Sequence, residues 1–402
     1  KKTIEEICSE ILIKLLLENS LYFRSNKMKL LLTAKQRGSA NVLAPVAKEL
    51  LQRGHQLTIY ATGNDNEAAG FNGLAFERIN PTDDSYSQLV KGYDAVMVGL
   101  SGHQTQDGYF LRAANSMGIP TIAVQDQNSG YLGRLGTNHA DLPTVLAVMD
   151  KDCIETARTE LGGEMGAEAA KRCRVIGWAA FDNYAKMRED FTEQKREELL
   201  HKIGLNPEEL VYFHATQNIH PESAYMQRSS MSAEEKRRIF DYECAVTALV
   251  FETASELGIR LVAKPHPGEE YIENFTQELA HQHGFVYMPA KACNTQELML
   301  TSYSITAGRS SCITEAALLD RNAGAILPGE LGKSWGSTGS PAITLGAIPV
   351  TYDWNGAREV VEKVTSLNEK IKRELAEDRK RFSVDGKAGK RLADLIEELG
   401  GK

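Results

Sequence analysis

Short apolar runs, each of the length of one β-strand, alternate with helix-patterned segments along almost the whole chain from Met28 onward. The runs are apolar on both faces, which predicts strands that are buried on both sides. Strands of this kind form parallel sheets whose two faces are covered by helices. In the first half of the chain the runs are 29–34, 56–62, 94–100, 120–125 and 144–149.

The pattern restarts in the second half, after a charged helical segment at 188–204. A Ser232-Ala-Glu-Glu235 sequence predicts a capping box that begins a long helix reaching Leu257. The strand candidates here are 209–216, 259–267, 285–288, 303–307, 323–328 and 347–352. We therefore expect an α/β fold of two Rossmann-like, doubly wound parallel-sheet domains facing a cleft. The expected parts are a first domain at 28–187, a linker at 188–207, a second domain at 208–354 and C-terminal helices at 355–402.

The composition narrows the class of protein. A chain of 402 residues exceeds one typical hydrophobic core, so its length agrees with two domains. The 42% hydrophobic and 25% charged residues are typical of a soluble globular protein, and the net charge of -8 argues against a nucleic-acid partner. The six cysteines are scattered singly, without a C-x-x-C pair, which indicates reduced core cysteines and a cytoplasmic protein.

Residues 1–27 carry apolar residues at helical spacing with charges between them, which predicts an amphipathic helix. The segment is too short and too charged to span a bilayer. It could dock on the domain, pair two subunits in a homodimer, or lie on a membrane surface as a peripheral contact, and these alternatives stay open. The chain does not begin with Met, so whether the segment is native or processed also stays open.

Polar residues recur where the predicted strands end. In open α/β sheets ligands bind beyond the carboxyl ends of the strands, so these residues are candidates for a binding site. In the second half the candidates are His214, Lys264, His266 and the turn Gly308-Arg309-Ser310-Ser311, and in the first half they are Gly38 and Ser39.

The turn from Gly308 to Ser311 opens a predicted helix that carries Glu315 in its first turn. Unpaired backbone N–H groups at such a junction favour an anion, of which phosphate is the obvious example, and Arg309 would strengthen its binding. The alternative is that Ser310 and Ser311 are ordinary N-caps and that Glu315 complements the helix dipole.

Other polar residues have competing interpretations. His103 follows a strand in the first half and is a candidate general base for an acceptor hydroxyl, or a solvent-facing loop histidine. Asp150-Lys-Asp152 has the D-x-D form of a metal site, but its place between a strand and a helix favours capping. Asp126 could bind an acceptor or form a turn. The chain lacks the G-x-S-x-G elbow, the phosphate loop of kinases and the dinucleotide fingerprint of dehydrogenases.

Three segments, taken in order, resemble motifs of the GT-B superfamily of nucleotide-sugar glycosyltransferases and the related non-hydrolysing UDP-N-acetylglucosamine 2-epimerases. Arg174-Val-Ile-Gly-Trp-Ala-Ala-Phe-Asp182 resembles the V-x-G-x-x-x-x-D stretch before the interdomain linker. Lys264-Pro-His-Pro resembles the His-Pro motif, and Gly308 to Glu315 resembles the donor-binding turn.

The resemblance implies a role for each matching residue. Ser310 and Ser311 would bind the phosphates of the donor, Glu315 would accept hydrogen bonds from the ribose, and His266 would contact the sugar or phosphate beside Lys264. Arg309 would add positive charge, and Gly38 and Ser39 would lie near the reacting sugar. His266 and Glu315, together with His103, are the predicted catalytic residues.

The implied function is transfer of a sugar from a nucleotide-activated donor to a glycan or lipid-linked acceptor, without a metal, in the synthesis of surface polysaccharides or glycoconjugates. The chain departs from the epimerases, because Pro328-Gly-Glu-Leu-Gly-Lys-Ser-Trp replaces their Thr-Glu-Arg-Pro-type stretch and Glu315 alone replaces an acidic pair. These departures favour a transferase. An epimerase and a non-catalytic nucleotide-sugar-binding subunit remain the alternatives.

Overall fold

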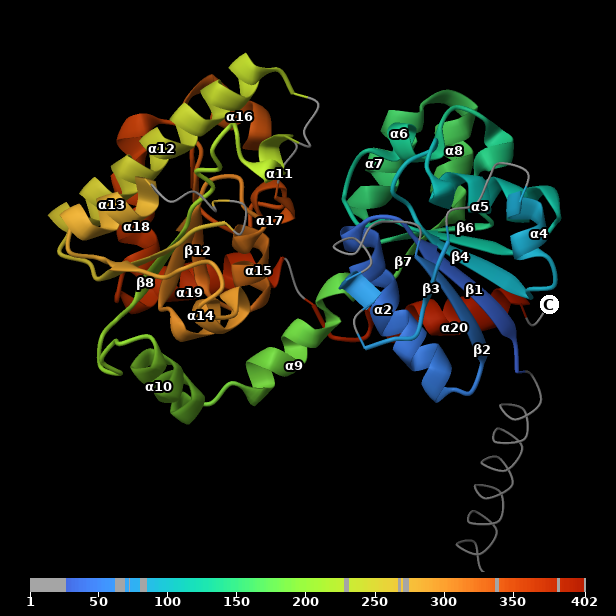
Figure 1. Cartoon of the computed structure of the whole chain (residues 1–402), viewed down its shortest axis with the longest axis horizontal. Helices are drawn as coiled ribbons and strands as arrows, with labels where there is room; N and C mark the ends of the chain where they lie inside the picture. The colour runs from blue at the N-terminus through green and yellow to red at the C-terminus, as the bar shows by residue number, and fades with distance from the viewer. Residues whose placement is uncertain are drawn as a thin grey trace, which may run out of the picture. The chain divides into compact units, whose positions relative to one another are not determined.

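The computed structural model describes residues 27–61, 69–71, 73–79, 85–227, 231–266, 269, 275–336, 340–381 and 384–400. The chain forms two compact units, of which one ends at Asp182 and also includes the chain from Asp385 onward, and the other spans Asn183–Val384 (Figure 1). Each unit contains a sheet with every strand pairing parallel, so the predicted pair of doubly wound α/β domains is confirmed. The amphipathic helix predicted before Met28 lies outside the described residues.

The first unit contains a seven-stranded sheet in the order β3-β2-β1-β4-β5-β6-β7. Its strands are β1 (Lys29–Ala34), β2 (Gln56–Ala61), β3 (Glu77–Arg78), β4 (Ala95–Gly99), β5 (Thr121–Val124), β6 (Val145–Val148) and β7 (Cys173–Val175). Its helices are α2 (Arg37–Gln52), α4 (Tyr86–Val90), α5 (Gln106–Ser116), α6 (Tyr131–Leu135), α7 (Asp152–Leu161), α8 (Gly163–Arg172) and α20 (Ala388–Gly400), with short 3-10 turns η1 (Ala69–Phe71), η3 (His139–Asp141) and η4 (Ala179–Phe181).

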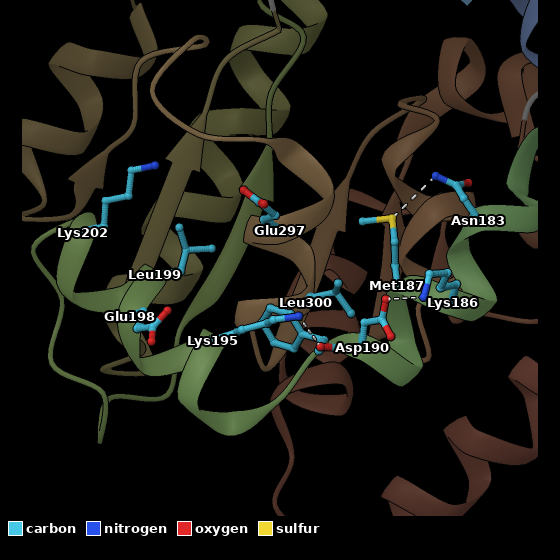
Figure 2. Close-up of a pocket in the computed structure, with 11 residues that line it drawn as sticks. Asn183, Lys186, Met187, Asp190, Lys195, Glu198, Leu199, Lys202, Glu297 and Leu300 are labelled. Carbon is cyan, nitrogen blue, oxygen red and sulfur yellow. Dashed lines mark hydrogen bonds and ion pairs between the residues drawn. The ribbon is translucent and has the colours of Figure 1, made fainter. Parts of the chain in front are cut away.

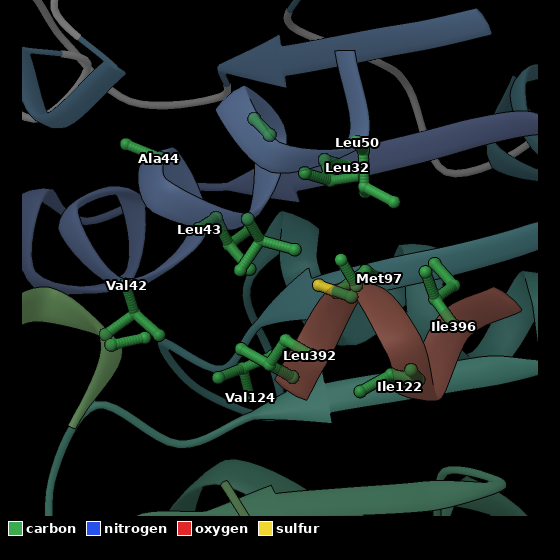
Figure 3. Close-up of a cluster of buried hydrophobic side chains, with 14 of the residues drawn as sticks. Leu32, Val42, Leu43, Ala44, Leu50, Met97, Ile122, Val124, Leu392 and Ile396 are labelled. Carbon is green, nitrogen blue, oxygen red and sulfur yellow. The ribbon is translucent and has the colours of Figure 1, made fainter. Parts of the chain in front are cut away.

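Helix α20 returns from the end of the sequence to pack against α2 (Figure 1). Leu392 and Ile396 of α20 join Leu43 of α2 and Met97 of β4 in one buried cluster (Figure 3). The carboxylate of Asp182 accepts hydrogen bonds from the backbone N–H groups of Ala388 (3.0 Å) and Gly389 (2.6 Å) at the start of α20. The last residue of the V-x-G-x-x-x-x-D stretch is therefore a helix cap.

The helix after β1 begins at Arg37, so Gly38 and Ser39, which we expected at the end of the first strand, lie inside a helix. Both residues lie in the first turn of α2, and Ser39 is fully buried. Glycine and serine suggested a turn, but helical backbone is available to both residues, and the apolar face of α2 packs onto the sheet from Ala40 onward.

The second unit contains a six-stranded sheet in the order β10-β9-β8-β11-β12-β13. Its strands are β8 (Tyr212–Ala215), β9 (Leu261–Lys264), β10 (Val286–Tyr287), β11 (Ser304–Ala307), β12 (Asn322–Ile326) and β13 (Val350–Thr351). Its helices are α9 (Asp182–Asp190), α10 (Glu193–Lys202), α11 (Ala224–Gln227), α12 (Ala233–Glu256), α13 (Phe275–Gln282), α14 (Thr295–Thr301), α15 (Cys312–Leu318), α16 (Gly329–Gly336), α17 (Pro341–Thr344), α18 (Ala357–Thr365) and α19 (Glu369–Lys380), with a 3-10 turn η5 (Trp354–Gly356). The predicted capping box is present at the start of α12, where Ser232 and Glu235 cap one another's backbone.

Both sheets have the strand order 3-2-1-4-5-6 of a doubly wound fold, with a further strand at one edge of the first. The order reverses between β1 and β4 in the first unit and between β8 and β11 in the second. Ligands of such folds bind beyond the carboxyl ends of the strands at these switch points. None of the helices in the described part of the chain is both long enough and apolar enough to cross a membrane.

Candidate functional site

The strands at the switch point of the second unit end in register. Ala215 of β8 pairs with Lys264 of β9 on one side and with Ala307 of β11 on the other. The segments that follow these three residues therefore leave the sheet side by side at its carboxyl edge. The predicted residues His266 and Gly308 to Ser311 lie on these segments, so the sheet brings most of the second-half candidates to one edge.

Lys264 and His266 lie at the end of β9. The ammonium of Lys264 is buried and donates to the carbonyl oxygen of Ala290 (2.7 Å) and the hydroxyl of Thr295 (3.1 Å), and burial lowers its pKa. His266 is half-buried, and burial, with the charges of Lys264 and Arg309, lowers the pKa of its imidazole. The positive charges of Lys264 and Arg309 therefore act on His266, and His266 stays neutral at pH 7.

The two serines of the turn have different surroundings. Ser310 is buried, and its hydroxyl accepts a hydrogen bond from the backbone N–H of Cys312 (3.3 Å). Ser311 occupies the N-cap position of α15 but its side chain caps no backbone N–H, so the capping alternative fits Ser310 alone. Ser311 is exposed and donates to Glu315 (3.0 Å). The helix that follows, α15, has only seven residues. Side chains must therefore contribute much of any anion binding at this turn.

Three donors hold the carboxylate of Glu315. Tyr184 of α9 and Gln296 of α14 each donate to Oε2 at 2.6 Å, and Ser311 donates to Oε1 at 3.0 Å. Burial, followed by the charge of Glu315, raises the pKa of the Tyr184 hydroxyl. The carboxylate is therefore oriented before any ligand binds, and a ribose would share or displace these donors.

Two buried carboxyl groups that the sequence did not single out lie at the same edge. Glu269 accepts hydrogen bonds from the Thr216 hydroxyl (2.8 Å) and the His266 backbone N–H (2.7 Å), and burial raises its pKa to about 7. Glu243 of α12 is 3% exposed and lies 3.9 Å from Arg309, and burial raises its pKa to about 8. A charged residue on a long helix resembles a solvated one in sequence, so only the tertiary contact reveals Glu243.

His214 does not reach this edge as predicted. It lies within β8, fully buried, with Nδ1 at 3.0 Å from the Thr306 hydroxyl and its ring against Phe251. Burial lowers the pKa of its imidazole to about 4, so it is neutral at pH 7. This environment gives His214 a packing role, and its proposed contact with a substrate stays a prediction.

The first unit has its own polar cluster at the switch point between β1 and β4. Asp107 accepts hydrogen bonds from the Ser101 hydroxyl (2.6 Å) and the Lys35 backbone N–H (3.0 Å), and burial raises its pKa to about 6. The hydroxyl of Ser39 lies 3.3 Å from that of Ser101 and 3.4 Å from the carboxylate of Asp126. Asp107 thus joins the ends of the two central strands.

Gly38 and Asp126 lie beside this cluster. A Cβ at Gly38 would collide with the carboxylate of Asp126, so a larger residue here would have to displace that side chain. Arg134 donates to Asp126 and to the carbonyl oxygen of Leu100. These contacts give Asp126 a structural partner.

His103 follows β4 and is paired with a carboxylate. Its Nε2 lies 2.8 Å from Asp141, and its ring packs so closely on Gly136, at φ 72°, that a Cβ there would collide with it. An imidazole that donates from Nε2 to a carboxylate presents Nδ1 as the basic nitrogen. The pair is therefore suited to accept a proton from a hydroxyl.

Asp150 accepts a hydrogen bond from the backbone N–H of Cys153 (3.0 Å), which confirms capping as the role of the D-x-D aspartate. Within the described ranges no cluster of three or more His, Cys, Asp or Glu side chains could hold a metal ion.

A pocket of about 540 Å³ lies among α9, α10 and α14 of the second unit (Figure 2). Its lining combines apolar residues with lysines, of which Lys186 pairs with Asp190 (2.9 Å) and Lys195 donates to the carbonyl oxygen of Asp190 (2.6 Å). It contains none of the predicted site residues. We therefore take the switch point of each unit, rather than this pocket, as the place of the candidate residues.

Comparison with known proteins supports the fold. No family model and no curated protein matches the chain by sequence. Among solved structures, a UDP-GlcNAc 2-epimerase from Neisseria meningitidis bound to UDP-GlcNAc aligns over 92% of this chain and 100% of its own, with a TM-score of 0.62 and 15% identity. S. aureus MnaA with UDP aligns over 92% and 96%, with a TM-score of 0.58 and 15% identity.

MurG of Acinetobacter baumannii also aligns, over 92% of this chain and 99% of its own, with a TM-score of 0.56 and 15% identity. The two-domain GT-B fold that the sequence motifs implied is thus confirmed. At this identity the likeness extends to the fold alone.

Proposed function

We propose that this protein is an enzyme acting on a nucleotide-activated sugar, as a GT-B-type glycosyltransferase. The observation that carries the proposal is the aligned row Lys264–Ala215–Ala307, from which His266 and the turn Gly308 to Ser311 leave the sheet together at the switch point. An edge with two cations, a neutral imidazole and hydroxyl groups is suited to a diphosphate.

The chemical step would depend on charge stabilisation. Lys264 and Arg309 would stabilise the negative charge that develops on the departing phosphate. Glu315, held in position by Tyr184 and Gln296, would hydrogen-bond the ribose and so orient the donor. In an inverting reaction the His103–Asp141 pair would accept the proton of the acceptor hydroxyl. The acceptor would be a glycan or lipid-linked saccharide of surface-polysaccharide or glycoconjugate synthesis.

A thermal-shift screen tests the first step. UDP, CDP, GDP, dTDP and CMP, and their sugar conjugates, are each added to the full chain, and a nucleotide that binds only the folded state raises the melting temperature. At a concentration 100 times its Kd it contributes about 2.7 kcal/mol, which corresponds to a shift of several degrees. No shift with any nucleotide would refute the proposal.

Variants of the site test the assignment of residues. We expect Glu315→Ala and His266→Ala to abolish transfer while the proteins remain folded. Glu252→Ala is the control, because Glu252 is exposed on α12 and belongs to no part of the site. Full turnover by both site variants would contradict the assignment.

Epimerisation is the second candidate, because several of the similar structures are UDP-N-acetylglucosamine 2-epimerases. This reaction requires no acceptor and exchanges the proton at C2. Incubating the protein with UDP-N-acetylglucosamine in D₂O separates the candidates, since deuterium at C2 indicates epimerisation and its absence excludes it for this substrate. Nucleotide binding without turnover of any donor and acceptor pair would instead indicate a non-catalytic subunit.

A further inference from the structure

Glu243 is a buried acid at a place where the proposed function requires an anion to bind. It projects from α12 to the turn between β11 and α15, where a Cβ on Gly308 would lie 3.3 Å from its Oε2. Its Oε1 lies 3.9 Å from the Arg309 guanidinium but makes no hydrogen bond with any described residue. A buried carboxyl oxygen without a hydrogen bond is costly and calls for an explanation.

An ionised Glu243 would oppose an anionic ligand in two ways. It would pair with Arg309, which the ligand also needs, and it would repel the ligand's own negative charge through a buried, poorly screened environment. A neutral carboxyl would release Arg309 and could donate a hydrogen bond. We propose that Glu243 is a proton-linked positioning residue, which must be protonated for an anionic ligand to occupy the Gly308 to Ser311 turn.

This inference rests on the proposed function, since it deepens the recognition of a phosphate-bearing donor at the same turn. Among the residues that the structure describes, the charged and titratable groups that act on Glu243, or feel its charge, are Arg309, Glu269, Tyr242 and Cys244. Arg309 favours the ionised form, while burial and Glu269 favour the neutral form that the proposal requires. Burial raises the pKa of Glu243 to about 8, so the carboxyl is mainly protonated at pH 7.

The proposal predicts how affinity changes with pH. Binding of UDP to the wild-type chain, measured by calorimetry from pH 7 to pH 9.5, should take up a proton and weaken by up to about tenfold per pH unit once Glu243 ionises in the free protein. The charge on the phosphates of UDP is nearly constant in this range, because their last ionisation near pH 6 is complete. The uracil ring loses its proton only at the alkaline end of the range, and this affects the wild type and the variants alike. Repeating the titration at pH 8.5 in two buffers of different ionisation enthalpy measures the proton uptake directly.

Glu243→Gln separates this effect from the titration of Lys264, which would also weaken anion binding at high pH. Glutamine retains a hydrogen-bond donor and cannot ionise, so the variant should match the wild type at pH 7 and bind at least tenfold more tightly than the wild type at pH 9.5. Glu252→Gln makes the same chemical change at an exposed position of α12 and should follow the wild type.

Each outcome has one meaning. A loss of pH dependence and of proton uptake in Glu243→Gln supports the proposal. An equally steep fall in affinity in this variant assigns the titration to another group and overturns the proposal, while leaving the nucleotide-binding function intact. Absence of proton uptake by the wild-type protein overturns it without any variant. Failure of the wild type to bind UDP or any other nucleotide of the screen refutes the proposed function and this inference with it.

Discussion

Replacing Glu243 by glutamine should stabilise the unliganded protein, by an amount that depends on pH. Burial raises the pKa of Glu243 from its ordinary value of 4.5 to about 8 in the folded chain. Between these pH values the unfolded chain has lost the proton and the folded chain still binds it. The free energy of unfolding of the wild type therefore falls as pH rises through this window, and the loss is complete above pH 8.

The magnitude follows from the two pKa values. Each pH unit above 4.5 lowers the free energy of unfolding by about 1.4 kcal/mol. At pH 7 the wild type is therefore about 3 kcal/mol less stable than a variant with an uncharged side chain at position 243. The lost attraction to Arg309 offsets little of this gain. Glu243 is mainly protonated at pH 7, and a pair with an arginine that is 34% exposed contributes about 1 kcal/mol at most. Glu243→Gln should therefore gain about 3 kcal/mol at pH 7 and less than about 1 kcal/mol at pH 5.

Urea unfolding at pH 5, 6, 7 and 8, followed by far-UV circular dichroism and fluorescence, measures this difference. Glu252→Gln should show no pH-dependent difference, because its side chain is exposed. If Glu243→Gln is no more stable than the wild type at pH 7, or if its advantage does not grow between pH 5 and pH 8, Glu243 is not a buried neutral acid and the reasoning fails.

Three further outcomes test other parts of the structure. Tyr184→Phe removes one hydrogen-bond donor to Glu315, and calorimetry should show nucleotide binding weakened by about tenfold, because a hydrogen bond to a charged group contributes about that much. Unchanged affinity would show that Gln296 and Ser311 are enough to hold Glu315 in position. Asp141→Asn should lower kcat of transfer more than it changes KM for the acceptor, because the substitution acts on the base His103 and not on acceptor binding. A change confined to KM would contradict the role of His103 as the base. Leu392→Ala should lower the free energy of unfolding by about 2–5 kcal/mol in a urea titration, because α20 closes the first core; a cost below about 1 kcal/mol would mean that α20 is dispensable.

The strands that build the two sheets were predictable because most of them are buried throughout. β1, β4, β5 and β6 of the first unit are almost entirely inaccessible, and their sequences are accordingly apolar runs. β3 has two residues, both exposed, and β7 has only one buried residue of three. These strands lie at the two edges of the sheet and carry no apolar pattern, so sequence reasoning missed them.

The candidate site was predictable only in part. Strand ends can be read from the sequence, and with them Lys264, His266 and the Gly308 to Ser311 turn. The donors to Glu315 cannot be read in this way, since Tyr184 lies 131 positions away in the sequence. His214 shows the converse limit, because a polar residue near a strand end can still be buried within the sheet when both sides of the sheet are covered.

The two switch points differ in charge, and this difference favours one unit as the nucleotide side. At the first, the carboxylate of Asp107 already accepts the hydrogen bonds of the Lys35 backbone and the Ser101 hydroxyl, so the donors that a phosphate would need are in use. At the second, the cations Lys264 and Arg309 lie with the exposed Ser311, and the acids nearby have pKa values raised by burial to about 7 and 8. Glu243 is mainly neutral at pH 7 and so does not cancel the charge of the two cations, whereas an ionised Glu243 would. The nucleotide is therefore expected at the second unit, and the affinity of that unit for an anion should depend on the protonation of Glu243.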